Sequence, residues 1–454
     1  MAAAYIHPRT LHLALLPAPR TSPCFLLPAP VNSMRRLAAL SLLVVALPAF
    51  AQAPDPYLAR VKKLLATTPI IDGHNDVPWE IRENREKPRD VDHFDLRTNL
   101  KNQDTDLARL KQGGVGGQFW SIYIPGEVKD SGYARIQLEE FDIARRMIAK
   151  YDKEMIFART AADARRAMTQ GKLASFLGLE GGHAIENSLG ALRIYYDLGA
   201  RYMTLTHNVT LDWADAALDK ATHDGLTPFG EEVVREMNRL GMIVDLSHVS
   251  PAVMSDALNV TESPVMFSHS PARALSDHPR DVPDSILVRL KQNGGIVMVT
   301  FVREFVSQKN LSWRVARSAR RRELAAGFGG DTARLNAAMS EWIRANPEPI
   351  VTLKDVADHY DHIKQLIGAD YIGIGADFDG TGGEHIEGLE DVSKYPYLLA
   401  ELARRGWTDV ELRKIANGNI LRVLEANEAV AARLQKARRP STRTIDEADR
   451  GPRK

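Results

Sequence analysis

Short apolar runs rich in β-branched residues alternate with longer stretches of helical periodicity along the whole chain after Pro54. This alternation is typical of repeated βα units, whose strands lie parallel in one sheet. Eight strands are expected, at residues 69–72, 117–124, 174–179, 202–206, 242–246, 264–268, 295–301 and 371–376. Helical patterns between them include residues 136–151, 189–198, 230–240 and 356–367.

Eight βα units predict an α/β chain folded as a (β/α)8 TIM barrel, a single domain over residues 54–434. The expected strands span about 300 residues, against about 250 for a typical barrel, which leaves room for insertions. A doubly wound open sheet is the alternative, but its first strand usually leads into a glycine-rich phosphate turn. Asp72-Gly73-His74 is not such a turn. The barrel is therefore favoured.

The charge balance argues for a small-molecule partner. Lys and Arg number 59 against 58 Asp and Glu, a formal net charge of +1. No net field therefore favours nucleic acid or anionic lipid. Apolar residues make up 44% of the chain, enough for a sizeable buried core. We expect no nucleic-acid partner, and a homodimer is left open.

The first 53 residues are interpreted as an N-terminal extension and signal peptide. A basic start at Met34 is followed by an apolar run over residues 37–47 and by small residues that fit cleavage after Ala51 or Ala53. We take Met34 as the initiator. The apolar run is shorter than the roughly 20 residues that a membrane-spanning helix needs. We therefore expect an exported protein, periplasmic or secreted, with no transmembrane span in the mature chain.

Two further segments do not fit the βα pattern. Residues 303–349 separate the last two expected strands, and they fold either as an extended loop over the barrel mouth or as an outer helical excursion. The arginine-rich stretch within it, residues 314–322, is interpreted as a solvated face. Residues 435–454 are polar and charged without an apolar face, so disorder is expected there.

Six side chains of metal-binding type close or immediately follow six different expected strands. They are His74, Glu180, His207, His248, His269 and Asp377. Parallel strands of a barrel bring their carboxyl ends to one rim, where barrel active sites form. We expect the six side chains to converge there.

Any one of these residues alone is more often a hydrogen-bonded structural group. Several imidazoles and carboxylates in one apolar mouth, however, are costly to desolvate unless a cation holds them. Zinc accepts both kinds of ligand, and a shared carboxylate allows two ions to bind side by side. The only cysteine, Cys24, lies upstream of the proposed cleavage, so a thiolate zinc site is excluded from the mature chain. The set is interpreted as a catalytic metal site in a barrel of the metal-dependent hydrolase type.

Eight ordered motifs over residues 69–424 resemble the membrane (renal) dipeptidase family of zinc metallopeptidases. They are Ile71-Asp72-Gly73-His74-Asn75-Asp76, Gly114-Val115-Gly116-Gly117-Gln118-Phe119-Trp120-Ser121, Glu180-Gly181-Gly182-His183, Leu205-Thr206-His207-Asn208, Asp245-Leu246-Ser247-His248-Val249-Ser250, Phe267-Ser268-His269-Ser270, His278-Pro279-Arg280 and Gly375-Ala376-Asp377-Phe378-Asp379-Gly380.

The resemblance implies two Zn²⁺ per chain. His74 and Asp76 correspond to the ligands of one zinc, His248 and His269 to those of the other, and Glu180 to the bridge between them.

The resemblance also implies the reaction, hydrolysis of the peptide bond of dipeptides by a metal-bridged hydroxide, extending to dipeptides with a D-residue and to β-lactams. His207 would contact the scissile carbonyl, Arg280 the substrate carboxylate, and Asp377 would carry protons. One departure is visible, because the family usually has Asn after the substrate arginine and Asp281 stands here. We interpret His183 as either a partner of Glu180 or a structural residue.

Two alternatives are kept open. One is another two-metal barrel amidohydrolase, a deacetylase or a lactonase, which has no need of the carboxylate clamp that Arg280 offers. The other is a non-catalytic binding barrel, which usually has lost a metal ligand, whereas the ligand set here is intact.

Overall fold

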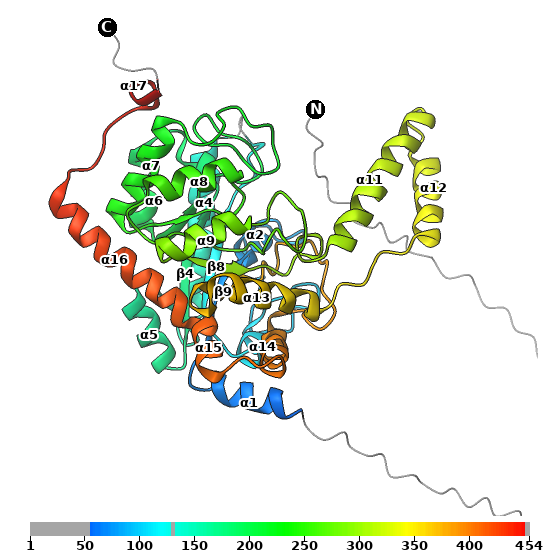
Figure 1. Ribbon diagram of the computed structural model, residues 1–454, viewed down its shortest axis with the longest axis horizontal. Coiled ribbons are helices and arrows are strands. Elements are labelled where there is room, and N and C mark those ends of the chain that lie inside the picture. Colours follow the sequence, from blue (N-terminus) through cyan, green and yellow to red (C-terminus); the bar gives the residue numbers. More distant parts are fainter. Residues whose placement is uncertain (1–54, 129–131, 450–454) are drawn as a thin grey trace, which may run out of the picture. The chain divides into compact units, whose positions relative to one another are not determined.

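The computed structural model describes residues 55–128 and 132–449, and the proposed signal peptide and its cleavage sites lie outside them. Eight parallel strands close into a barrel (Figure 1). These are β1 (Ile70–Asn75), β2 (Val115–Tyr123), β4 (Leu173–Glu180), β5 (Ala200–Thr204), β6 (Ile243–Asp245), β7 (Met266–Phe267), β8 (Ile296–Val299) and β9 (Ile372–Ile374). The strand order is β2-β1-β9-β8-β7-β6-β5-β4, and pairing of β2 with β4 closes it. The predicted (β/α)8 barrel is confirmed.

A ninth strand, β3 (Met155–Phe157), was not expected from the sequence. It pairs in parallel with the first residues of β4, from Leu173 to Ser175, on the edge that β5 occupies further along. A run of three residues that follows a helix after one short turn is too short to show a strand period. β3 therefore extends the barrel wall without changing the closure.

Most of the helices cover the outside of the barrel (Figure 1). The helices before β7 are α1 (Pro56–Leu65), α2 (Val77–Arg82), α3 (Leu107–Gln112), α4 (Tyr133–Lys150), α5 (Ala161–Thr169), α6 (Leu189–Leu198), α7 (Pro228–Leu240) and α8 (Pro251–Val260). Those after it are α9 (Asp284–Asn293), α10 (Arg303–Val306), α11 (Gln308–Gly327), α12 (Thr332–Ala345), α13 (Leu353–Ile367), α14 (Tyr395–Arg404), α15 (Asp409–Arg413), α16 (Asn419–Ala437) and α17 (Ile445–Asp449). Of these, α11 and α12 project from the barrel. None of the described helices is long and apolar enough to cross a bilayer.

Helix starts follow the capping residues more closely than the apolar period. α7 begins two residues before the expected start because Thr227 caps it, accepting a hydrogen bond from the Gly230 N–H, and Pro228 suits the first turn. α13 begins earlier for the same reason, with Thr352 and Asp355 forming a capping box.

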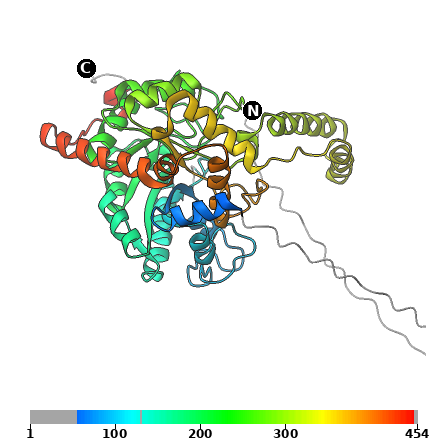
Figure 2. The ribbon, with the colours of Figure 1, turned by 60° about the horizontal axis from the view of Figure 1, so that its bottom comes forward.

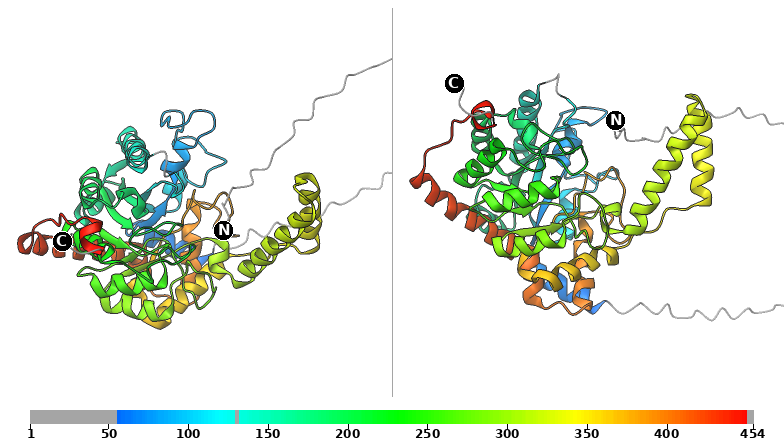
Figure 3. Two further views of the ribbon diagram at one scale, coloured as in Figure 1. Left: turned by 90° about the horizontal axis from the view of Figure 1, so that it is seen from above. Right: turned by 45° about the horizontal axis from the view of Figure 1, so that its top comes forward.

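The insertion between the last two barrel strands forms an outer helical excursion. α11 and α12 make a helical hairpin that stands away from the barrel (Figures 1 and 3). The base of this hairpin is held by Arg314, whose Nε lies 2.8 Å from a carboxylate oxygen of Glu304. The interpretation of the arginines as a solvated face therefore fits the exposed Arg321 and Arg322 but not Arg314.

The C-terminal segment differs from the expected disorder over residues 435–449. α16 continues to Ala437, and α17 lies at the start of α7 (Figure 2), where the Phe229 N–H donates to Asp449 Oδ1 at 2.7 Å. Ser441 Oγ also donates to Glu232 Oε2 on α7 at 2.9 Å. These contacts are polar, so a search for an apolar face could not reveal them.

The inside of the barrel is filled by alternate strand residues. The fully buried inward side chains are Ile71, Phe119, Phe176, Tyr202, Ile243, Met266, Ile296 and Met298. The rings of Phe119 and Phe176 stack with their centres 4.6 Å apart. This packed apolar interior lies directly beneath the polar residues at the carboxyl ends of the strands.

Candidate metal centre

All six expected side chains come together at the carboxyl end of the barrel strands. His74 lies in β1 and Glu180 ends β4. His248 and His269 follow β6 and β7 by two or three residues. Asp76, which opens α2, reaches the same place.

The ligand-type atoms form three overlapping groups, each within 4.8 Å, that could hold a metal ion. The groups are His74 with Asp76 and Glu180, Glu180 with His248 and His269, and His74 with His269 and Asp377. The two carboxylate oxygens of Glu180 lie near different ligand groups, one near His74 and the other near His248. Oε2 lies 3.4 Å from His74 Nε2, and Oε1 lies 3.0 Å from His248 Nε2. This division suits a carboxylate that bridges two ions.

The Nε2 atoms of His248 and His269 lie only 2.9 Å apart. The Nδ1 atom of His248 is paired with Asn208 Oδ1 at 3.0 Å, an acceptor that requires the ring proton on Nδ1. The Nδ1 atom of His269 is paired with Ser268 Oγ, whose own hydrogen is donated to Asp245 Oδ2. In the neutral rings both Nε2 atoms therefore carry lone pairs that face each other. A cation between them removes this repulsion.

Asp72 is a buried carboxylate that fixes two parts of the site. It accepts hydrogen bonds from the backbone N–H of His74 at 2.9 Å and from that of Ala376, the residue before Asp377, at 3.0 Å. The Tyr395 hydroxyl donates to it as well, at 2.9 Å. This role was not predicted from the sequence.

Asp245 is a second buried carboxylate, and it fixes the backbone next to His248 and His269. It accepts the backbone N–H of Ser268 at 2.8 Å and the hydroxyl of Thr204 at 2.6 Å. Both carboxylates stand two or three residues before a histidine of the site, as Asp72-Gly73-His74 and Asp245-Leu246-Ser247-His248. An aspartate within or at the end of a strand, shortly before a histidine of the site, was the sequence feature that could have indicated this role.

Two site residues have a left-handed backbone although they are not glycine. The φ angles are 69° at His248 and 70° at Asp377. Such conformations cost about 1–3 kcal/mol and concentrate at functional sites, where the surrounding structure holds them.

The carboxylates of the site differ in their tendency to ionise. Burial raises the pKa of Glu180, but the positive field of His74 and the hydrogen bond from its ring prevail and hold the pKa well below its usual value. Burial raises the pKa of Asp377 well above its usual value, and repulsion from Asp76 and Glu180 adds to this effect. Glu180 is thus suited to bind cations and Asp377 to exchange a proton.

His207 forms one wall of the site together with an aromatic residue. Its Nε2 lies 4.0 Å from Glu180 Oε1, and its ring meets the edge of Tyr123 at 4.8 Å between centres. Burial lowers the pKa of His207 to about 4, so the ring is neutral at pH 7. Tyr123 ends β2 and was not predicted as a site residue.

Arg280 is 2% exposed, and its guanidinium Nη1 has no hydrogen-bond partner. Burial lowers its pKa to about 10, while Asp377 and Glu180 oppose that shift, so the group stays cationic at neutral pH. A buried charge with an unused donor is suited to an anionic ligand group. Asp281 beside it is also fully buried, and neither of its carboxyl oxygens has a partner. Burial raises the pKa of Asp281 well above its usual value, which favours the neutral form.

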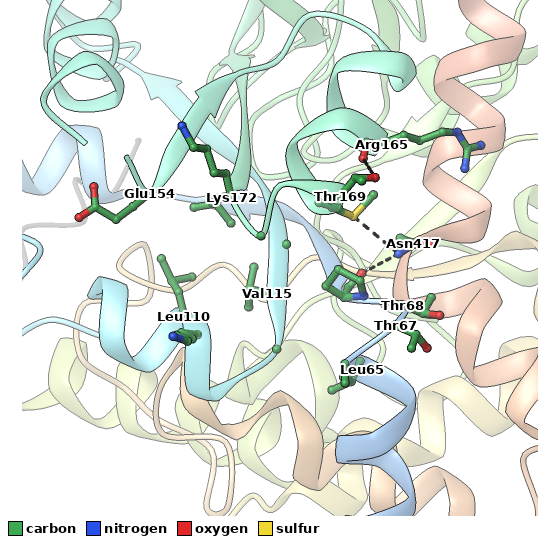
Figure 4. Close-up of a pocket in the computed structure, with 18 of the residues that line it drawn as sticks. Leu65, Thr67, Thr68, Leu110, Val115, Glu154, Arg165, Thr169, Lys172 and Asn417 are labelled. Carbon is green, nitrogen blue, oxygen red and sulfur yellow. Dashed lines mark hydrogen bonds between the residues drawn. The ribbon is translucent and has the colours of Figure 1, made fainter. Parts of the chain in front are cut away.

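His183 lies outside the ligand groups, since its Nε2 is paired with the Ile124 carbonyl at 2.9 Å. A cavity of about 780 Å³ also lies elsewhere (Figure 4). Pro69, Gly114 and Leu173, which line it, stand just before or at the start of barrel strands, the end away from the metal ligands. It contains none of the predicted site residues.

Residues 58–438 match the family described as Membrane dipeptidase (Peptidase family M19). The chain therefore belongs to the membrane dipeptidase family. It is a metallopeptidase, a hydrolase of the dipeptidase class.

Solved structures share the fold. A probable dipeptidase, PvdM from Pseudomonas aeruginosa, is 22% identical, with a TM-score of 0.69 over 83% of this chain and 100% of that one. A metallo peptidase from Rhodobacter sphaeroides, liganded with a phosphinate mimic of the dipeptide L-Ala-D-Ala, is 23% identical, with a TM-score of 0.65 over 80% and 99%. The dipeptidase AC is 24% identical, with a TM-score of 0.66 over 80% and 99%.

Proposed function

We propose that this protein hydrolyses dipeptides with two zinc ions held by His74, Asp76, Glu180, His248 and His269. The observation that carries the proposal is the 2.9 Å approach of His248 Nε2 and His269 Nε2, both on rings whose Nδ1 atoms are already paired. The donor set, imidazole and carboxylate without thiolate, suits zinc. Two bound zinc ions would lower the pKa of water from about 15.7 toward about 7, supplying hydroxide at neutral pH, and would polarise the amide carbonyl.

Three further side chains would act on the substrate directly. Neutral His207 donates a hydrogen bond to the oxygen that gains charge in the transition state. Asp377, whose pKa is raised, takes a proton from the attacking group and gives it to the leaving amine. Arg280 binds the free carboxylate of the substrate with its two-pronged guanidinium.

Binding of the substrate carboxylate by Arg280 would favour dipeptides over longer peptides. Arg280 lies at a fixed distance from the metal ligands, so a longer peptide would place its carboxylate elsewhere. Neutral Asp281 would leave the charge of Arg280 available to the substrate. The Rhodobacter sphaeroides peptidase carries a mimic of a dipeptide with a D-residue. We extend the same tolerance to this protein, with hydrolysis of β-lactams as a further activity.

A dipeptide panel with metal analysis tests the proposal. We expect about two zinc ions per chain and hydrolysis of L,L- and L,D-dipeptides, lost on chelation and restored by zinc. Hydrolysis of acetylated amines or lactones in preference to dipeptides would instead favour a deacetylase or a lactonase. Full metal loading without turnover of any of these would favour a binding barrel.

We also propose that the protein is exported and that cleavage follows Ala51 or Ala53. Expression from Met34 with mass spectrometry of the extracytoplasmic fraction tests this. An uncleaved chain retained in the cytoplasm would contradict it.

A further inference from the structure

Tyr202 is a β5 residue whose side chain lies inside the barrel. Its hydroxyl contacts His74, which belongs to the ligand group of His74, Asp76 and Glu180. Tyr202 is fully buried, and its hydroxyl oxygen lies 2.8 Å from His74 Nδ1 and 3.3 Å from the Gly73 carbonyl oxygen. The Tyr202 hydroxyl contacts His74 and is not itself assigned as a metal ligand. Its contact is with the ring nitrogen of His74 that faces away from Asp76 and Glu180.

The hydrogen count at this hydroxyl sets the orientation of the contact. A phenol has one hydrogen, and the Gly73 carbonyl can only accept it. When Tyr202 donates to Gly73, it accepts the Nδ1–H of His74. The Nε2 atom, 3.4 Å from both Asp76 Oδ2 and Glu180 Oε2, is then the nitrogen available to a metal.

The neighbouring strand is shaped to admit the phenol. Gly178 on β4 lies opposite Tyr202 in the strand register. A methyl group on Gly178 would overlap the phenol ring and its hydroxyl. Glycine at this position therefore keeps open the space that Tyr202 needs to reach His74.

The other two histidines of the proposed ligand set have equivalent partners. His248 Nδ1 faces Asn208 Oδ1, and His269 Nδ1 faces Ser268 Oγ. Metal-binding histidines generally donate their second ring N–H to such an acceptor, and loss of the acceptor weakens metal binding. Without Tyr202, His74 alone would lack one.

We propose that Tyr202 is a positioning residue that holds His74 with Nδ1 protonated and Nε2 directed to the metal shared with Asp76 and Glu180. The proposal rests on the proposed metal site. It predicts that loss of the hydroxyl affects one of the two metal positions and leaves the other, at His248 and His269, nearly unchanged.

Tyr202→Phe tests the proposal, with Tyr360→Phe as the matched control. Tyr360 is also a fully buried tyrosine whose hydroxyl donates to a glycine carbonyl, that of Gly373, at 3.1 Å, but it contacts no ligand of the site. Both variants lose a hydrogen bond to a glycine carbonyl, and only Tyr202→Phe also removes the acceptor of His74 Nδ1–H. Differences between them therefore report on His74 and not on folding stability, which thermal unfolding measures in parallel.

Competition with a chromophoric chelator gives the affinity of each zinc in the full chain. We expect Tyr202→Phe to weaken one zinc by about 10- to 100-fold and the other by less than about threefold, with both unchanged in Tyr360→Phe. In the zinc-loaded wild type, labelling of histidine with ¹⁵N should show the His74 proton on Nδ1, identified by its loss in His74→Gln. In Tyr202→Phe that resonance should shift or broaden.

Equal zinc affinities in the two tyrosine variants, with an unchanged His74 resonance, would overturn the proposal. Equal weakening of both zinc positions would overturn it as well, because that result indicates a general loss of structure. A wild-type chain that binds no zinc would instead overturn the proposed function itself, so the two failures are distinguishable.

Discussion

The guanidinium carbon of Arg280 lies 5.4 Å above the centre of the Phe305 ring. The aromatic face stabilises the cation without using its N–H groups, so the donors stay available for a ligand.

Replacing Arg280 by Met should therefore act on substrate binding. Charged hydrogen bonds of this kind are worth about 1.5–3 kcal/mol, so we expect KM for dipeptides to rise by roughly 10- to 100-fold. Comparison of a dipeptide with its C-terminal amide measures the effect, since the variant should lose the wild-type preference for the free acid. Arg289→Met, at a surface arginine bonded to Ser255, is the control. If the wild type already prefers the amide, Arg280 does not bind the substrate carboxylate.

Asp377→Asn should impair turnover instead. Asn keeps the shape of the side chain but carries no proton, so we expect kcat to fall by about 100- to 10,000-fold with metal content retained. Asp379→Asn is the control, because Asp379 accepts the Asp104 N–H at 2.8 Å and should affect stability more than turnover. Loss of a metal ion from Asp377→Asn would show that this carboxylate is a ligand with His74 and His269.

Glu180→Gln should weaken both metal positions together, because a neutral amide cannot bridge two cations as a carboxylate does. Metal content after dialysis and re-loading measures this directly. Glu236→Gln, at a buried glutamate paired with Arg239, controls for the loss of a buried charge. Retention of one fully occupied position in Glu180→Gln would argue against a bridge.

Buried neutral histidines should make the fold sensitive to acid. His359 accepts the Ala272 N–H at 3.1 Å, and burial lowers its pKa from 6.5 to about 4. The unfolded chain binds this proton first, so the stability is complete above pH 6.5 and is lost as the pH falls toward 4. The full loss is about 3 kcal/mol.

Urea unfolding at neutral and acidic pH tests this, since His359→Gln should reduce the difference between the two. His93→Gln, at an exposed position outside the helices, is the control. Equal acid sensitivity in His359→Gln and wild type would contradict the assignment.

The sequence predicts the barrel and its polar rim well because both depend on local patterns. Strand periodicity places His74, Glu180 and His269 at strand ends, and the shared direction of parallel strands then brings them together. The structure places these groups as that argument requires.

What the sequence did not predict depends on contacts between distant segments. From the sequence, Tyr202 is an ordinary inward-facing strand residue. Its hydrogen bond to His74 becomes visible only in the folded barrel, where Gly178 on β4 leaves space for the ring. Asp72 likewise joins β1 to the residues after β9, a pairing over most of the chain. The β3 strand and the contacts of α17 are too short or too polar to leave a periodic signal.

The ligands of the candidate metal site come from strands in separate parts of the chain, yet the rings of His74 and His269 lie with their centres 4.0 Å apart. That proximity exists only when β1 and β7 both stand in a closed barrel, so metal binds the native state and not the unfolded one. By mass action, a metal at 100 times its dissociation constant adds about 2.7 kcal/mol to the free energy of unfolding. A bound metal would thus make the fold more resistant to heat and proteolysis, besides enabling its chemistry.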